Sequence, residues 1–280
     1  MVRIIMLIII MCATLPIFSQ KIQGKAIYKT HRKIDVKLDS KKVGGNSDIQ
    51  KAINEQLKKQ FQKTYVLSFT SQESTYKQKE KLSKPEFSTG GVQIEIVGNG
   101  SVNDVLYKNL SENRYLNKTE ISGKLFLIND KFLDLKWEMT GETKTIGKYT
   151  CYKAVREQQI ESVSFTSSEE GKDKKERKKE IEETIAWYTP EIPISNGPGM
   201  HGGLPGLILE IQEGKQTIVC SEIVINPSKK IEIKEPTKGK KVTQEKFDKI
   251  MREKNEEMME RFKNRRKSKD GSSFSIEIQG

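Results

Sequence analysis

The sequence predicts a mainly β protein of the α+β class, with a curved antiparallel sheet or half-barrel, one helix in its N-terminal half and a second near its C-terminus. Three observations predict this class. Apolar and polar residues alternate over most of residues 64–155 and 184–225, turn-forming Gly, Asn and Ser separate these runs, and no crossover helix lies between them. With 34% hydrophobic and 31% charged residues, the 280-residue chain can bury one core beside long solvated stretches.

The first strand and the first helix are expected before this alternating region. Residues 25–38 alternate in a way that suits an extended strand with one solvated face. Ser47 and Gln50 then form a capping box that opens a helix reaching about Lys63. One face of that helix carries an apolar stripe for the core, formed by Ile49, Ile53, Leu57 and Phe61.

The strands that follow are predicted from period-two alternation and from the turns between them. We expect them at residues 65–69, 92–96, 105–107, 125–128, 133–137, 149–155, 184–189, 207–211 and 216–225. Short connections such as Gly98–Gly100 favour antiparallel pairing.

The first nineteen residues are typical of a secretory signal peptide. Arg3 supplies the positive start, residues 4–16 are apolar but too few to remain as a membrane span, and Ser19 is a small residue before the expected cleavage. We therefore expect residues 1–19 to be removed and the mature chain to hold no stable transmembrane segment. The alternatives are an uncleaved anchor and a lipid-modified Cys12, although the residues before Cys12 are not small.

After the leader, we expect one β-rich domain over residues 20–240. Within it, residues 157–183 carry a dense run of Lys and Glu with no apolar face, which indicates a charged mobile insertion or hairpin tip. Residues 241–280 are expected to form a charged C-terminal helix and tail. Thr243 would cap this helix, which would either dock on the sheet or lie free.

The chain is basic, with 50 Lys and Arg against 38 Asp and Glu and a net charge of +12. Loss of Arg3 with the leader leaves 49 minus 38, or +11. An excess of this size often indicates a nucleic-acid partner, but export argues against one. We expect no nucleic-acid partner, and assign the charge to solubility or to attraction toward an anionic envelope surface.

Two cysteines remain in the exported chain. Cys151 and Cys220 each sit in an apolar, strand-like run, and an oxidising compartment favours their pairing. A disulfide would close a loop of about 70 residues and stabilise the fold by about 4 kcal/mol. Two buried, unpaired thiols are the alternative.

A Pro/Gly loop follows the strand that ends at Pro190. Prolines and glycines crowd residues 193–206, so this segment cannot be helical. Pro205 and Gly206 fit the two central positions of a type II turn, which would place Gly206 at positive φ. The chain then enters a hairpin through residues 207–225.

The same loop carries a specific resemblance. Its hexapeptide is Gly203, Leu204, Pro205, Gly206, Leu207 and Ile208, and residues 147–154 and 187–193 have a similar family pattern. From Lys118 onward the chain resembles the GLPGLI family of exported proteins from Gram-negative bacteria. The resemblance implies the periplasm or outer envelope, or secretion, and supplies no catalytic residues. The strand-rich middle is also similar in pattern to periplasmic lipoprotein carriers, a likeness of fold alone.

Little in the sequence favours catalysis. His31 and His201 are the only imidazoles, and no known nucleophile, metal or phosphate-binding motif occurs. His201 is the best candidate for a base or, with a cysteine, a soft-metal ligand, and Glu191 and Glu210 could pair as carboxylates. We expect no catalytic, cofactor or metal residues.

The predicted function is a non-enzymatic binding or interaction module of the envelope. Its expected partner is a hydrophobic ligand or an outer-membrane protein. A carrier of a lipid-like ligand in the sheet's concavity is one alternative. A metal-handling protein or enzyme centred on His201 is the other.

Overall fold

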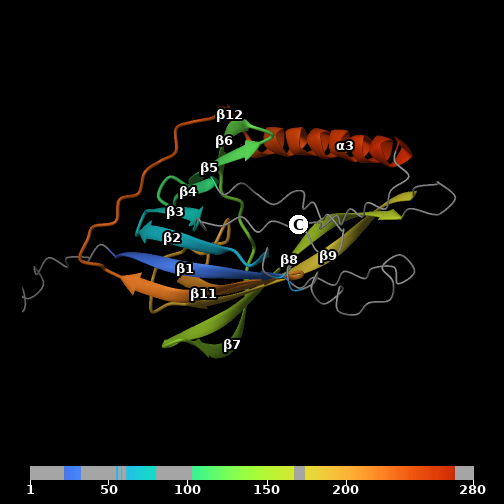
Figure 1. Ribbon diagram of the computed structural model, residues 1–280. Coiled ribbons are helices and arrows are strands. Elements are labelled where there is room, and N and C mark those ends of the chain that lie inside the picture. Colours follow the sequence, from blue (N-terminus) through green and yellow to red (C-terminus); the bar gives the residue numbers. More distant parts are fainter. Residues whose placement is uncertain are drawn as a thin grey trace, which may run out of the picture.

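The structure is a computed structural model that describes residues 22–32, 55, 58, 61–79, 103–166 and 174–268. The described residues form one sheet and one C-terminal helix (Figure 1). The strands are β1 (Gln23–Arg32), β2 (Thr64–Thr70), β3 (Glu73–Gln78), β4 (Val105–Asn109), β5 (Arg114–Ile121), β6 (Lys124–Lys131), β7 (Glu138–Ile146), β8 (Tyr149–Thr166), β9 (Lys174–Thr189), β10 (Leu207–Glu213), β11 (Gln216–Ile225) and β12 (Lys240–Val242); the helix is α3 (Gln244–Ser268).

The twelve strands follow the order β12-β6-β5-β4-β3-β2-β1-β11-β10-β9-β8-β7. Every neighbouring pair is antiparallel except β12 with β6, so the predicted mainly β class is confirmed. As far as the chain is described, the sheet is not closed, and β12 and β7 are its two edges.

Alternation along β1 shows why the sequence pattern predicts this sheet. Ala26, Tyr28 and Thr30 are buried, whereas Lys25 and Lys29, at alternate positions, are exposed. Side chains on successive strand positions point to opposite faces, so one face of β1 reaches the core.

Several expected elements lie outside the described residues: the leader 1–19, residues 33–38, the 92–96 strand and most of the helix over 47–63. Phe61, at the end of that helix, has helical backbone and is buried. Thr30 fixes this end to β1, because its Oγ1 donates to the Phe61 carbonyl over 2.9 Å and accepts from the Lys63 amide over 3.0 Å.

The strand expected over residues 133–137 is wrong. Residues 132–137 are irregular, Leu133 is 82% exposed and Lys136 has a φ of 50°. Asp134 accepts the Lys136 amide over 3.2 Å, a local turn that competes with strand pairing. The next strand is β7, which begins at Glu138, directly after the predicted segment. Because β7 is an edge strand with few buried residues, its sequence shows no alternation of buried and exposed positions.

The charged segment 157–183 takes part in strand pairing where it is described. β8 and β9 pair as far as Thr166 with Lys174, whereas β10 stops pairing with β9 at Glu213 and Thr184. Residues 157–166 and 174–183 therefore extend past the rest of the sheet as a two-stranded ribbon, visible in Figure 1 as the long β8–β9 arm.

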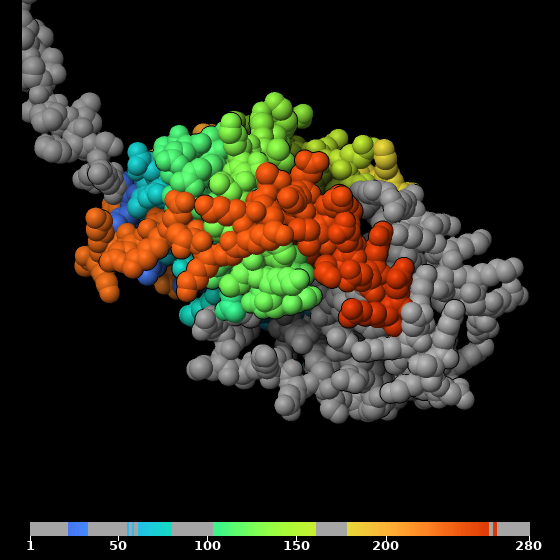
Figure 2. Space-filling model, turned by 90° about the horizontal axis from the view of Figure 1, so that it is seen from above, coloured from blue at the N-terminus to red at the C-terminus, as the bar shows by residue number. Residues whose placement is uncertain are grey.

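The core covers one face of the sheet, and a long connection packs on the other. Ile233 of the segment between β11 and β12 packs against Tyr107, Leu116 and Leu127, and Ile231 is buried. Figure 2 shows this connection in orange beside the green surface of β5 and β6. The connection carries the chain from β11, in the middle of the sheet, to the edge formed by β12.

Helix α3 starts beside that edge. Thr243 Oγ1 accepts the Lys246 amide over 3.3 Å as an N-cap, close to the predicted start. Phe247 meets Phe126 of β6 edge-to-face with centroids 5.7 Å apart, and Ile250 also packs on the core, so the first turns dock on the sheet. Among the described residues, no helix has the length and apolar character needed to span a membrane.

Candidate functional site

The Pro/Gly loop between β9 and β10, residues 190–206, crosses the core face of the sheet. Three backbone hydrogen bonds of 2.7–2.8 Å join residues two positions apart in it, with Pro193, Ser195 and Pro205 at their centres. This is the γ-turn pattern, and the fixed φ of proline suits its central position. The loop is thus built from successive tight turns.

The hexapeptide 203–208 forms the end of the loop and the start of β10. Leu204, Leu207 and Ile208 are buried in the main core, whereas Pro205 is exposed. The Ile208 amide donates to the Asn196 carbonyl over 2.9 Å, so the motif closes back on the loop that precedes it. These apolar residues have a packing role.

The expected positive φ at Gly206 is wrong. Within the hexapeptide the positive φ belongs to Gly203, at 84°. Gly206 is required for another reason: a Cβ there would overlap the carbonyl of Thr189 and the nitrogen of Pro190. Two backbone segments pass so closely at this point that no side chain fits between them.

A buried lysine holds the middle of the loop. Lys108 of β4 is fully buried, and its Nζ donates to the carbonyl oxygens of Gly197 (3.0 Å), Gly199 (2.8 Å) and His201 (3.2 Å). An ammonium has three donors, so all are used. Burial lowers the pKa of Lys108 to about 7, while the three carbonyl dipoles favour the charged form.

A second contact fixes the loop beside this lysine. Asn196 Nδ2 donates to Ser74 Oγ over 2.9 Å, and Ser74 of β3 pairs directly with Lys108 in β4. In strand order, β2, β1 and β11 separate β3 from β10. The loop therefore ties two distant parts of one sheet together across its core face, an arrangement we call the loop clamp (Lys108, Ser74 and Asn196).

A polar cluster lies where the loop meets β8 to β10. Glu213 accepts hydrogen bonds from Arg156 (3.0 Å) and Thr184 Oγ1 (3.2 Å). Arg156 also stacks over the Trp137 ring at 5.5 Å, and Trp137 Nε1 donates to the Gly202 carbonyl over 2.8 Å. These contacts hold the loop's far end.

His201 lies within this cluster, 3.7 Å from Glu213 through Nε2. Burial, together with the positive charges of Arg156 and Lys108, lowers the pKa of His201 to about 3. The imidazole is therefore neutral at neutral pH. An effective general base has a pKa near the working pH, and the pKa of His201 lies well below neutral pH, so His201 is a poor general base. Its surroundings are those of a structural histidine.

Neither alternative chemistry predicted for this region is assembled in the described residues. No group of three or more His, Cys, Asp and Glu that could hold a metal ion occurs in those parts of the chain. Glu191 accepts the Thr150 amide over 2.9 Å, and Glu210 pairs with Lys144 over 2.7 Å. The two carboxylates thus have separate roles.

The two cysteines are free thiols in the structure. Cys151 lies in β8 and Cys220 in β11, with β9 and β10 between them. Burial raises the pKa of Cys151 to about 11 and that of Cys220 to about 12. Both thiols are therefore protonated at neutral pH and slow to react.

Strand β7 exposes a feature that sequence reasoning missed. Met139 is 62% exposed and accepts the Tyr188 hydroxyl at Sδ over 3.4 Å. Tyr152, 39% exposed, packs against Tyr188 with centroids 6.1 Å apart. We call Met139, Tyr152 and Tyr188 the edge strip. No periodic pattern reveals it, because its members come from three strands.

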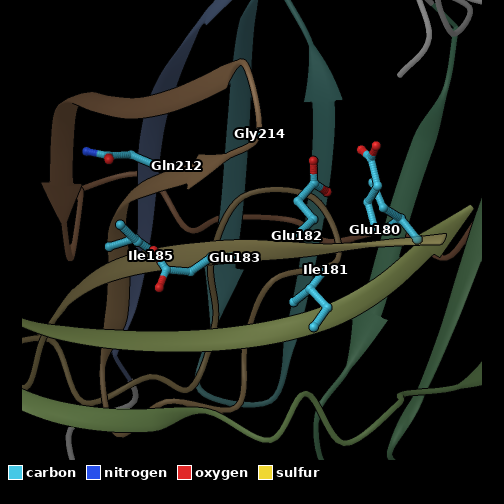
Figure 3. A pocket seen from close by; sticks show the side chains of 8 residues that line it. Glu180, Ile181, Glu182, Glu183, Ile185, Gln212 and Gly214 are labelled. Carbon is cyan, nitrogen blue, oxygen red and sulfur yellow. The ribbon is translucent and has the colours of Figure 1, made fainter. Parts of the chain in front are cut away.

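A cavity of about 380 Å³ lies at the base of the β8–β9 arm. It is lined by Ile160, Glu180, Ile181, Glu182, Glu183, Ile185, Gln212 and Gly214. In Figure 3, Glu180 and Glu182 point to one side of the ribbon and Ile181 to the other. Three carboxylates make this lining acidic, and an acyl chain there would strip them of water at high cost.

Comparison with known proteins adds little about function. No curated protein matches the chain. Two solved structures, described as PNGF-II in the C2 and P21 space groups, are 13% and 14% identical, each with a TM-score of 0.46. They cover 82% and 81% of this chain, which spans about a third (32%) of their length. Residues 137–210, from Trp137 through the Pro/Gly loop into β10, match the model of a family described as "Protein of unknown function (Porph_ging)".

Proposed function

We propose that this chain is an exported protein of the GLPGLI type that acts in the Gram-negative envelope as a non-enzymatic interaction module. The observation that carries the proposal is β7, a nine-residue edge strand with an exposed apolar strip beside it. Export rests on the leader-like residues 1–19 and on the family resemblance of the hexapeptide.

An edge strand offers unpaired N–H and C=O groups to another strand, and proteins normally shorten, cover or charge such edges. The opposite edge follows this rule, since β12 has three residues and α3 begins beside it. β7 is partly protected by Gly141, at a φ of 79°, and by a register shift between Met139 and Thr143. Residues Thr143–Ile146 pair regularly with β8, and no strand of the described parts of the chain pairs with their outer side.

Strand addition suits this edge. A partner in extended conformation would gain backbone hydrogen bonds to β7 and side-chain contacts with the edge strip, the usual division between affinity and specificity in this mode of recognition. Tyr152 is 39% exposed and packs against Tyr188, and a tyrosine supplies a large contact area at low entropic cost. An outer-membrane protein is the partner class that the proposed location favours.

The remaining features support binding over catalysis. The buried cation Lys108 donates all three N–H groups to the loop, and His201 is neutral and enclosed. The acidic cavity at the arm gives no support to an acyl-chain carrier. The polar groups of the Pro/Gly loop are thus committed to its structure.

Site-specific photo-crosslinking in intact producing cells tests the proposal. A photoreactive residue replaces exposed Thr143 in β7 or, as the control, exposed Lys25 in the central strand β1. We expect adducts of one discrete mass from position 143 and none from position 25. Equal labelling at both positions, or no adduct at 143, would refute the assignment of β7 as the binding edge.

A further inference from the structure

The proposed function leaves open what occupies β7, and the sequence outside the described residues offers a strand of the right chemistry. Resting on that function, we propose that β7 binds the C-terminal segment Phe274–Gln279 of a second copy of this chain, which extends the sheet by one strand. The contact is then between two different surfaces of identical molecules.

The segment has the pattern of a half-buried strand. Its apolar and polar residues alternate strictly: Phe274, Ile276 and Ile278 share one side, and Ser275, Glu277 and Gln279 share the other. Five residues, 269–273, lie between the end of α3 at Ser268 and this segment.

One side of β7 lies beside apolar residues and the other side beside charged residues, which matches the apolar and polar sides of the segment. Thr143 pairs with Tyr152, which in turn pairs with Tyr188, so the edge strip lies on the Thr143 side of the strand. The next residue, Lys144, points to the other side; its side chain is 33% exposed and its ammonium pairs with Glu210. An added strand would place its apolar residues against the edge strip and Glu277 near Lys144.

Lys144 has further room for an acidic partner. Its Nζ lies 4.3 Å from the Trp187 ring centroid and 2.7 Å from Glu210, so it makes one ion pair and one aromatic contact on the protein side. An ammonium has three donors, and the hydrogen bond to Glu210 uses one of them. A carboxylate from Glu277 is complementary to it.

A second copy is required because the segment of the same chain starts too far away. The segment follows the end of α3 at Ser268, and α3 packs against β6, near the opposite edge of the sheet from β7. Figure 1 shows α3 along the top of the molecule and β7 at the bottom. The five residues 269–273 span about 18 Å at most when fully extended. A link of this length is short for a path from the top of the molecule to the bottom, so we assign the contact to a neighbouring copy, which has no such limit.

A contact of this kind is heterologous, because a tail from one copy meets an edge on the next. Heterologous contacts repeat from copy to copy, giving rings or open chains. This property supplies a test that an isologous dimer would fail.

Two complementary variants provide that test. One ends at Asp270 and keeps the edge without the tail segment; the other carries Thr143→Pro and keeps the tail while losing a backbone donor of β7. By light scattering after size-exclusion chromatography, the full chain should show a mass above the monomer that grows with concentration. Each variant alone should be monomeric, and an equimolar mixture should form dimers and nothing larger.

Met139→Asp replaces Thr143→Pro if circular dichroism shows that the proline variant is unfolded, because Met139 is an exposed member of the edge strip. A synthetic peptide of residues 271–280, titrated onto the variant ending at Asp270, should bind in fluorescence anisotropy. The same peptide with Ile276→Asp should bind about tenfold more weakly or worse.

A full chain that is monomeric at every concentration, or a mixture that forms no dimer, would overturn the proposal. Binding of both peptides equally would do the same. The proposed function is tested separately by crosslinking. Adducts at Thr143 that contain another protein of the envelope would support the proposed function and overturn the second copy as the partner, whereas no adduct at Thr143 would refute the function itself.

Discussion

Asn196 donates a hydrogen bond to Ser74 Oγ over 2.9 Å, joining the loop before β10 to a strand that lies four positions away in the sheet. Lys108 lies opposite Ser74 on the neighbouring strand. It donates to three carbonyl oxygens of the same loop, those of Gly197, Gly199 and His201. A sheet whose distant strands are tied across one face must stay curved. The loop clamp thus gives the Pro/Gly loop a definite mechanical role.

Lys108→Met should lower the free energy of unfolding by about 2 kcal/mol. The change relieves the desolvated ammonium but leaves three buried carbonyl groups without a donor, and orphaned buried groups cost more than most intact bonds supply. Chemical denaturation measures the effect. Lys77→Met, at an exposed site on the neighbouring strand β3, is the control and should change stability by less than about 0.5 kcal/mol.

Replacing the two glycines of the hexapeptide should separate close approach from backbone strain. Gly203→Ala places a side chain at positive φ with no overlap, its nearest neighbour being Trp137 Cδ1 at 3.9 Å, and should cost about 1 kcal/mol. Gly206→Ala forces the Thr189 backbone away from β10 and should cost about 3 kcal/mol. Thermal and denaturant unfolding of both variants gives the comparison, and equal losses would contradict the assigned roles.

His201 should make the stability of the protein depend on acid. Its native pKa is about 3, whereas the unfolded chain takes up the proton near the ordinary value of 6.5. Between these values the unfolded state binds more protons, so stability conferred by the neutral imidazole is full above pH 6.5 and is lost as the pH falls toward 3, by up to about 4 kcal/mol.

His201→Gln removes this dependence while keeping a polar side chain of similar size. The difference in unfolding free energy between the native protein and the variant should therefore shrink steadily from pH 7 to pH 4. Titration of other carboxyl groups cancels in the difference. Two parallel stability curves would show that His201 does not remain neutral in the folded chain.

Cys151 and Cys220 should react slowly with a thiol reagent at pH 8 in the folded protein, because their pKa values are raised to about 11 and 12. After unfolding in denaturant both should react at once, and mass spectrometry should show two labels on these residues. A native protein in which neither thiol can be labelled, even when unfolded without reductant, would mean that the two residues form a disulfide.

Much of the sheet is predictable from the sequence, because strands with one buried face keep a visible alternation. The segments at 65–69, 105–107 and 125–128 are strands in the structure, within β2, β4 and β6. The interpretation fails at 133–137 and at β7, where the irregular segment has apolar residues and the edge strand has almost no buried side. Alternation of apolar and polar residues appears only where one face of a strand is buried, and the edge strand β7 buries almost no side chains.

The candidate site is less predictable. Lys108 follows the apolar residues Leu106 and Tyr107, and from the sequence it looks like a solvated residue at the end of a strand. In the structure it is fully buried. Its three acceptors are 89 to 93 residues further along the chain. The type II turn predicted for Gly206 is wrong, because Gly206 has no positive φ. The close backbone contact that requires a glycine there comes from the end of β9 and has no local signal.

Hydrogen exchange of Lys108→Met, read residue by residue, tests the loop clamp most directly. We expect faster exchange at the Leu207 and Ile208 amides, which donate to the loop carbonyls of Ile192 and Asn196, while the β8–β9 pairing keeps its protection. Unchanged protection at Leu207 and Ile208, matching that in Lys77→Met, would contradict the claim that Lys108 holds the Pro/Gly loop across the sheet.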